Sequence, residues 1–307
     1  MAQKILLPLD GSTLAERAVP YGLRLASEMG AHLLLMHGRP PRGATTVPDF
    51  DVAEFARGLR EGEAVGALSD SRRIDIEAIT REVYLDKAAE AICQTAVEED
   101  VDLIVMSTHG HGGLGRKLFG TTADQVLCRA TVPVVLVSSA CTTTWTSTGP
   151  RRILLPLDGS HFAEAVLEPA GRLAGLLQAE LFLVGAAGPM EAVYDAATPS
   201  GQERFDAALR ETQDYLESVA SSLRELGHIV HVDAESGRPA TVLSGVASRR
   251  HIDMIALATH GRTGIARLTL GSVASEALQQ TTVPLFLVRP DALREIESQQ
   301  LAATQPR

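Results

Sequence analysis

The eight residues ILLPLDGS occur twice in this chain, at 5–12 and again at 153–160. A second pair of matching segments follows, THGHGGLGRKLFGTT at 108–122 and THGRTGIARLTLGSV at 259–273. The copies keep their order and nearly their separation, with an offset of 148 residues at the first segment and 151 at the second. Because this period far exceeds the roughly 20–50 residues of solenoid or propeller repeats, the chain contains a duplicated domain.

The length of 307 residues agrees with a pair of domains, since one domain usually takes roughly 100–200 residues. We place the first domain at 1–138 and the second at 151–290, with a Ser/Thr-rich linker at 139–150. A polar tail, 291–307, follows the second domain. Trp145 stands out in the linker, and we expect it to pack across the domain junction.

Short apolar runs alternate with amphipathic stretches in each half. The runs of the first half are KILLPL, HLLLMH, RIDIEAIT, DLIVMS and VPVVLV, and the second half repeats this series. Continuous apolar runs of this length are typical of strands buried on both faces of a parallel sheet. Their alternation with helices predicts an α/β fold, here two tandem doubly wound open sheets of about five mainly parallel strands flanked by helices.

The last run of each half, VPVVLV or VPLFLV, would leave an apolar sheet edge exposed in a separate domain. We therefore expect these strands to bring the halves together as a pseudo-two-fold pair, an intramolecular equivalent of a dimer. The covalent link raises the effective concentration of one half for the other. A homodimer of whole chains is compatible with this arrangement.

The composition limits the partners. A net charge of −10 argues against non-specific binding to nucleic acid, which needs clustered Lys and Arg. No apolar run approaches the roughly 20 residues of a membrane span, and the start MAQKILLPLD has no signal-peptide layout. Cys93, Cys128 and Cys141 form no CxxC pair, which is typical of a reducing compartment, although the polar stretch around Cys141 could expose that thiol. We expect a cytoplasmic protein with no nucleic-acid or membrane partner.

The repeated motifs fall where open α/β sheets bind ligands. The segment DGS follows the first strand of each half and the Gly-rich segment follows the fourth, so both lie at the carboxyl ends of the strands. The carboxylates of Asp10 and Asp158 can accept hydrogen bonds there from a ribose hydroxyl or a base amine. The chain is therefore expected to have two ligand crevices, one in each half.

The Gly-rich loop suits an anion. Its glycines let the backbone approach a ligand, and the helix that begins after it offers free N–H groups and the positive end of its dipole. The hydroxyls of Thr121 and Ser272 can donate to phosphate oxygens or cap that helix. Arg116 and Arg267 are placed alike, and each could reach a phosphate or remain in solvent. The loop glycines are Gly110, Gly113 and Gly120 in the first half and Gly261, Gly264 and Gly271 in the second.

Some of these motifs also have interpretations that need no binding site. An isolated Asp-Gly-Ser is more often only a strand-to-helix turn with an N-cap serine, and that interpretation stays open; its repetition beside a Gly-rich loop favours a site. His109 and His111 do not predict a metal site, because zinc usually takes three or four protein ligands and nothing nearby supplies the others. The chain has neither the G-x-S-x-G elbow of hydrolases nor the G-x4-G-K-[S/T] loop.

The chain resembles a tandem universal stress protein over nearly all of both halves. The nucleotide motif of that family is G-x2-G-x9-G-[S/T]. Its later part matches as Gly110-x9-Gly120-Thr121 and as Gly261-x9-Gly271-Ser272. Ser107 and Ala258 replace the first glycine of the motif. Both replacements are small, so the backbone can still approach a ligand closely, although a positive φ there is disfavoured.

This resemblance implies that the protein binds ATP, with ADP or AMP as alternatives and Mg²⁺ accompanying ATP. It places an adenosine-contacting aspartate at Asp10 and Asp158, and an adenine-pocket residue at Gly38 and Ala186. The implied nucleotide-site residues are Leu9, Asp10, Gly38, Ser107, His109, Gly110, Gly113, Arg116, Gly120, Thr121 and Thr122 in the first half, and Leu157, Asp158, Ala186, Ala258, His260, Gly261, Gly264, Arg267, Gly271, Ser272 and Val273 in the second.

The resulting expectation is a non-catalytic, nucleotide-dependent regulator in the stress response, whose ATP sets the conformation shown to a partner. The alternatives are a non-nucleotide interaction module and a slow ATPase. The sequence supplies no catalytic base, so we expect at most weak ATP hydrolysis. We also expect the second half to hold the tighter site. In the first half Asp124 lies near the start of the helix that follows the Gly-rich loop, where its carboxylate would repel phosphate, and the second half has Ser275 at this position.

Overall fold

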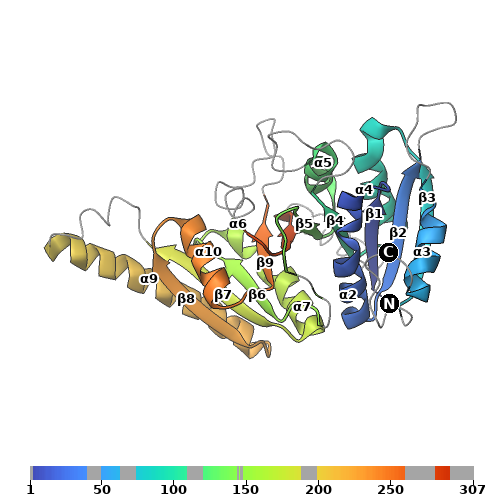
Figure 1. Ribbon diagram of the computed structural model, residues 1–307. Coiled ribbons are helices and arrows are strands. Elements are labelled where there is room, and N and C mark those ends of the chain that lie inside the picture. The colour runs from blue at the N-terminus through green and yellow to red at the C-terminus, as the bar shows by residue number, and fades with distance from the viewer. Residues whose placement is uncertain are drawn as a thin grey trace, which may run out of the picture.

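The computed structural model describes residues 3–39, 50–62, 74–108, 120–143, 145, 148–187, 199–259 and 281–290. All described strands belong to one ten-stranded sheet, and helices cover both of its faces (Figure 1). The sequence-based prediction of a mainly parallel α/β fold is therefore confirmed. The two sheets that we expected are joined edge to edge into one.

The elements follow the expected order in each half. The first half contains β1 (Lys4–Leu9), α1 (Thr13–Glu16), α2 (Val19–Met29), β2 (His32–Arg39), α3 (Val52–Glu61), β3 (Ile76–Glu82), a 3-10 turn (Leu85–Lys87), α4 (Ala88–Glu98), β4 (Leu103–Ser107), α5 (Thr121–Arg129) and β5 (Val134–Val137). The second half contains β6 (Arg152–Pro156), α6 (His161–Glu164), α7 (Leu167–Leu177), β7 (Glu180–Ala187), α9 (Pro199–Glu225), β8 (Val230–Ser236), α10 (Pro239–Arg249), β9 (Met254–Ala258) and β10 (Leu285–Val288).

The strand order is β3-β2-β1-β4-β5-β10-β9-β6-β7-β8. Every neighbouring pair within a half is parallel, whereas β5 and β10 are antiparallel, with Leu136 opposite Leu285 and Val135 opposite Phe286. These two strands come from VPVVLV and VPLFLV, the runs from which we expected contact between the halves. All four residues of each strand are buried, so the two apolar edges cover one another.

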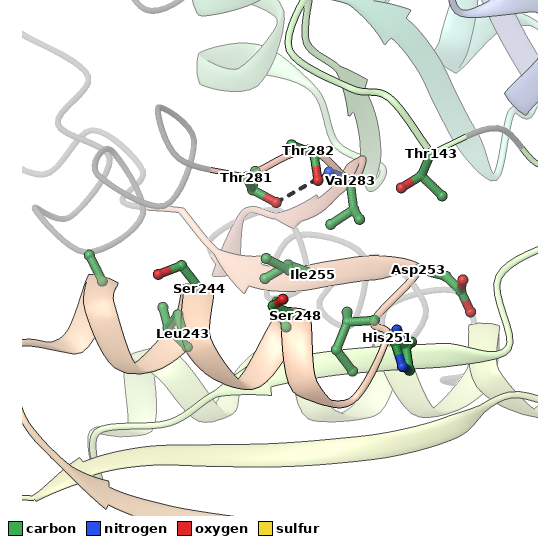
Figure 2. Close-up of a pocket in the computed structure, with 13 residues that line it drawn as sticks. Thr143, Leu243, Ser244, Ser248, His251, Asp253, Ile255, Thr281, Thr282 and Val283 are labelled. Carbon is green, nitrogen blue, oxygen red and sulfur yellow. Dashed lines mark hydrogen bonds between the residues drawn. The ribbon is translucent and has the colours of Figure 1, made fainter.

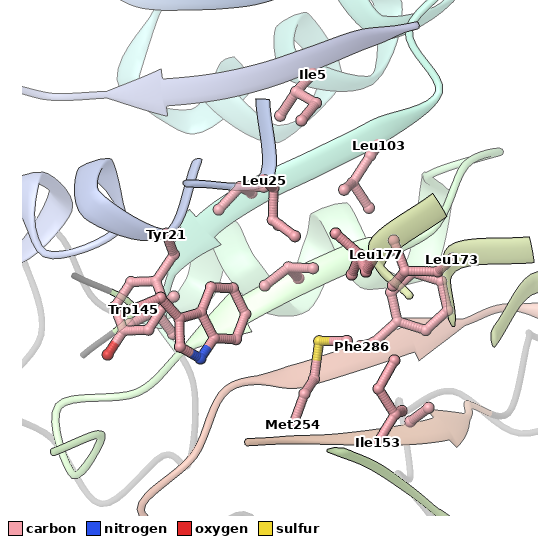
Figure 3. Packing of buried hydrophobic residues seen from close by; sticks show 14 of the residues in the cluster. Ile5, Tyr21, Leu25, Leu103, Trp145, Ile153, Leu173, Leu177, Met254 and Phe286 are labelled. Atoms are coloured by element: carbon pink, nitrogen blue, oxygen red, sulfur yellow. The ribbon is translucent and has the colours of Figure 1, made fainter. Parts of the chain in front are cut away.

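The core lies in two layers, one on each face of the sheet. The layer under α2, α3, α7 and α9 runs without a break from the first half into the second, and Figure 3 shows Ile5 and Leu103 in the same cluster as Ile153, Met254 and Phe286. The other layer lies under α4, α5 and α10. Because each layer contains residues of both halves, burial of apolar surface stabilises the halves jointly.

The linker packs closely against α2. Trp145 is buried and its ring meets the Tyr21 ring edge to face, with centroids 4.9 Å apart (Figure 3). Arg24 Nε donates to the Trp145 carbonyl at 3.1 Å, and Arg17 Nη2 donates to the Cys141 carbonyl at 3.0 Å. Trp145 thus packs on the first half, and its packing across the junction to the second half stays a prediction. Cys141, which its polar surroundings could have exposed, is buried, because this part of the linker packs on both halves: Arg17 holds the Cys141 carbonyl, and the Thr142 N–H donates to the Thr282 carbonyl.

Among the described helices, none has both the length and the apolar character needed to cross a membrane.

Candidate functional site

The two Asp-Gly-Ser turns have the same internal hydrogen bonds. Asp10 Oδ1 accepts from the backbone N–H of Ser12 at 3.0 Å and from its hydroxyl at 2.6 Å, and Asp158 Oδ1 accepts from Ser160 at the same distances. Each serine hydroxyl then accepts from a backbone N–H in the first turn of the following helix at 3.1 Å. The segment is therefore a strand-to-helix turn with an N-cap serine, and it fixes one carboxylate oxygen in each half.

Each turn needs its glycine, because Gly11 has φ of 76° and Gly159 has φ of 79°. Only glycine adopts this left-handed region without a steric cost. The conformation aims the chain from the end of β1 or β6 directly into a short helix. The aspartate that precedes it consequently stays at the carboxyl edge of the sheet.

The parallel registers bring the other predicted strand-end residues to the same edge. In the first half β1 lies between β2 and β4, so Leu9 and Asp10 stand between Gly38, at the end of β2, and Ser107, at the end of β4. The second half repeats the arrangement at the ends of β6, β7 and β9. Its residues at this edge are Leu157, Asp158, Ala186 and Ala258.

The start of α5 is held at this edge as well. The backbone N–H of Gly120 donates to the Thr108 carbonyl at 2.6 Å, and the N–H of Thr108 donates to the Val137 carbonyl at 3.0 Å. Gly120 is the N-cap of α5, and it supplies no side-chain cap to the first N–H groups. The N-terminus of α5, with Thr121 exposed and Thr122 half-buried, thus carries the donors and dipole that suit an anion.

The remaining predicted site residues lie outside the described residues. They are His109, Gly110, Gly113 and Arg116 in the first half and His260, Gly261, Gly264, Arg267, Gly271, Ser272 and Val273 in the second. Their assignment to the site stays a prediction. Among the residues that the structure does describe, no group of three or more His, Cys, Asp or Glu side chains could hold a metal ion.

Sequence reasoning missed three side chains beside the turns. His37 is buried next to Gly38, and its Nδ1 lies 3.0 Å from the Leu9 carbonyl oxygen. Phe50 packs against Gly11 and His37. In the second half the Tyr215 hydroxyl donates to Glu164 Oε1 at 2.8 Å. The pKa of Tyr215 is raised, first by burial, then by the hydrogen bond to Glu164 and by the charges of Glu164 and Asp158. Of these three residues, only His37 could have been suspected from the sequence, because it directly precedes the predicted site residue Gly38.

A hollow of about 430 Å³ lies elsewhere in the second half (Figure 2). It is lined by α10, the segment before β9 and residues 281–283, so it opens at the amino ends of β9 and β10, opposite the edge that carries Asp158. One of its residues, Asp253, already accepts from the backbone N–H groups of Arg151 and Arg152 at 2.9 and 3.0 Å. This hollow is distinct from the predicted crevice, and Asp253 in it orders the start of β6.

The family model described as "Universal stress protein family" matches residues 1–138 and 149–289. The chain belongs to this family. A universal stress protein of Mycolicibacterium smegmatis is 25% identical over 298 residues, which cover 93% of this chain and 97% of that protein. A universal stress protein of Thermus aquaticus is 36% identical over 145 residues, which cover 45% of this chain and 99% of that protein. The second relative thus has the length of one half.

Solved structures share the fold of this universal stress protein over its whole length. A universal stress protein from Archaeoglobus fulgidus gives a TM-score of 0.60 at 20% identity, covering 94% of this chain and 98% of that one. A functionally unknown protein from Pseudomonas aeruginosa gives a TM-score of 0.62 at 17% identity, covering 99% and 98%. At these identities the likeness is one of fold.

Proposed function

We propose that this universal stress protein is a non-catalytic regulator in the stress response that binds adenine nucleotide in each half. The observation that carries the proposal is the pairing, at one sheet edge, of the Asp10 turn with the N-terminus of α5. A carboxylate beside an N-terminus without a side-chain cap suits the two ends of a nucleotide, its hydroxyl- and amine-bearing adenosine and its anionic phosphates.

In this proposal Asp10 and Asp158 contact the adenosine, while Gly38 and Ala186 line the base. The phosphates lie at the start of α5 beside Gly120, against the N–H groups of Thr121 and Thr122 in the first half. The Gly-rich loops, whose residues lie outside those described, complete both sites. The ligand is ATP, with ADP or AMP as alternatives, and Mg²⁺ accompanies ATP through its phosphate oxygens.

We further propose that the halves, 1–138 and 151–290, act as an intramolecular pseudo-dimer in the cytoplasm. The antiparallel pairing of β5 with β10 and the core layer common to both halves support this arrangement. A bound nucleotide at either edge can then influence a surface that both halves share. A homodimer of whole chains would add a second interface to this internal one.

The test is to purify the protein without added nucleotide, denature it by heat and separate the released small molecules by chromatography. We expect ATP, ADP or AMP in the supernatant and an upward shift of the melting temperature when millimolar ATP is added to the emptied protein. Protein that releases no nucleotide and shows no shift would instead be a non-nucleotide interaction module. Rapid appearance of ADP from added ATP would instead make it an ATPase.

A further inference from the structure

The two Asp-Gly-Ser turns differ in the side chain that lies beside them. Next to the first turn, the Cβ and Cγ atoms of Phe50 lie 2.8 and 3.0 Å from the position that a Cβ on Gly11 would occupy. The Phe50 ring also meets the His37 ring edge to face, with centroids 5.1 Å apart. Since His37 directly precedes Gly38, Phe50 reaches from the turn after β1 to the end of β2.

The second turn has a polar neighbour, and the space beside its glycine is open. The Tyr215 hydroxyl points to Glu164, and Asp158 and the backbone N–H of Gly159 lie close enough to affect its pKa. No described atom lies within 4 Å of the position that a Cβ on Gly159 would occupy. The strand registers place Gly185 where the first half has His37, so this end of β7 carries no ring, and Thr212 and Leu216 of α9 pack against Gly185 instead.

The helices that follow β2 and β7 explain the difference. Arg60 of α3 donates to the carbonyl of Ile76, the first residue of β3, and Arg224 of α9 donates to the carbonyl of Val230, the first residue of β8. Arg60 and Arg224 therefore occupy equivalent positions in the two halves. Counting back nine residues from each arginine aligns Tyr215 of α9 with Asp51, the N-cap of α3. Helix α3 begins directly after Asp51, so Phe50, the residue before the N-cap, packs on the Asp-Gly-Ser turn. Helix α9 begins at Pro199 and so extends well beyond the position of Tyr215.

The exposure of the two turns follows their neighbours. Asp10 and Gly11 are half-buried, whereas the equivalent Asp158 and Gly159 are exposed. Phe50 is itself half-buried and also packs on the Phe55 ring at 5.4 Å between centroids. A ring that contacts a backbone turn and two other rings has little room to move aside, because packed side chains leave few voids.

We propose that Phe50 is a selectivity residue of the first crevice. The Phe50 ring forms the side of that crevice next to Asp10, where the ribose lies. The first crevice is therefore narrower around the ribose than the second. The inference rests on the proposed function, because it assigns the ribose to the aspartate. A nucleotide with a bulky group on its ribose is consequently excluded from the first crevice and accepted by the second, while unmodified ATP enters both.

The experiment uses the full chain in two backgrounds. Asp158→Ala weakens the second crevice and isolates the first, and Asp10→Ala does the reverse. Each is titrated with ATP and with ATP that carries an N-methylanthraniloyl group on the ribose. We expect the Asp10→Ala chain to bind both probes alike, and the Asp158→Ala chain to bind the labelled one at least roughly tenfold more weakly than ATP. Adding Phe50→Ala to the Asp158→Ala chain should remove that difference.

The control is Val97→Ala in the Asp158→Ala chain, which trims an exposed apolar side chain on α4 of the same half and should leave the ratio of the two affinities unchanged. If Phe50→Ala does not fold, Phe50→Leu takes its place. The expected result is a gain in affinity for the labelled nucleotide, which an unfolded chain cannot produce. Equal tolerance of the label in both backgrounds, or no effect of the Phe50 change, would overturn the role of Phe50 alone. A wild-type chain that binds no unmodified ATP would overturn the proposed function and this inference with it.

Discussion

Phe286 of β10 lies opposite Val135 of β5 at the centre of the ten-stranded sheet, so a residue of the second half completes the core of the first. Both side chains belong to one of the two core layers, each of which runs through both halves. The sheet is continuous because each half supplies the edge that the other lacks. A substitution at either residue should therefore lower the stability of both halves.

We expect Phe286→Ala to destabilise the protein by about 3–5 kcal/mol, because the side chain is fully buried and its removal leaves a cavity. The two halves should still unfold in one transition, since they share a core layer. Urea denaturation followed by circular dichroism and by the fluorescence of Trp145, the single tryptophan, measures both quantities. Leu226→Ala, at an exposed position, is the control and should cost less than about 0.5 kcal/mol. Two separate transitions would contradict the shared core.

Gly11→Ala and Gly159→Ala form a matched pair. Both glycines have a positive φ, so an alanine at either position pays a similar backbone cost of roughly 1–2 kcal/mol. Only at Gly11 does the new methyl group also meet Phe50, and we expect overpacking to cost about 1–3 kcal/mol more there. Thermal or urea denaturation of the two variants measures the difference. Equal losses would mean that Phe50 does not pack against the turn in solution.

Tyr21 should make the protein sensitive to alkaline pH. Burial, and secondarily the Cys141 thiolate, raise the pKa of Tyr21 from 10.0 to about 12. The unfolded chain releases this proton at lower pH than the folded one, so the stability that the neutral phenol contributes is complete below pH 10 and is lost as the pH rises towards 12.

Tyr21→Phe should remove the part of the stability loss at alkaline pH that comes from this phenol. Because the Tyr21 hydroxyl donates to the Thr143 carbonyl, the substitution should also lower the free energy of unfolding by about 1 kcal/mol at neutral pH. Urea midpoints between pH 8 and pH 11 give the profile. Tyr84→Phe, at an exposed position, is the control. An unchanged slope in the Tyr21 variant would show that this phenol does not couple to folding.

The two proposed nucleotide sites should differ in affinity, the second being tighter. Asp124 lies in the first turn of α5, and a carboxylate near phosphates costs on the order of 1 kcal/mol at 4 Å in water and more in a cleft. Gly120→Glu and Gly271→Glu each place charge and bulk where phosphate is proposed to lie. Titration with ATP should show the larger loss of tight binding for Gly271→Glu, about tenfold or more. Loss of tight binding in Gly120→Glu alone would reverse the ranking.

Much of the fold could be predicted from local patterns. The apolar runs define strands buried on both faces, and the repeat made every assignment in one half a test of the other. The Asp-Gly-Ser turn was also predictable, because its hydrogen bonds join residues two or three positions apart. The predicted strand-end residues Leu9, Gly38 and Ser107 meet at one edge because parallel strands place their carboxyl ends together.

The sequence by itself therefore determined the duplication, the succession of strands and helices in each half and the edge at which the candidate sites lie, since each follows from short-range periodicity and repetition. Only the tertiary structure decided which side chains surround the turns. Phe50 reaches Gly11 across a separation of 39 residues, and Tyr215 reaches Glu164 across 51. Such contacts depend on where α3 starts and on how far α9 extends, and the repeat does not preserve either. The two halves consequently share their turns but not the walls beside them.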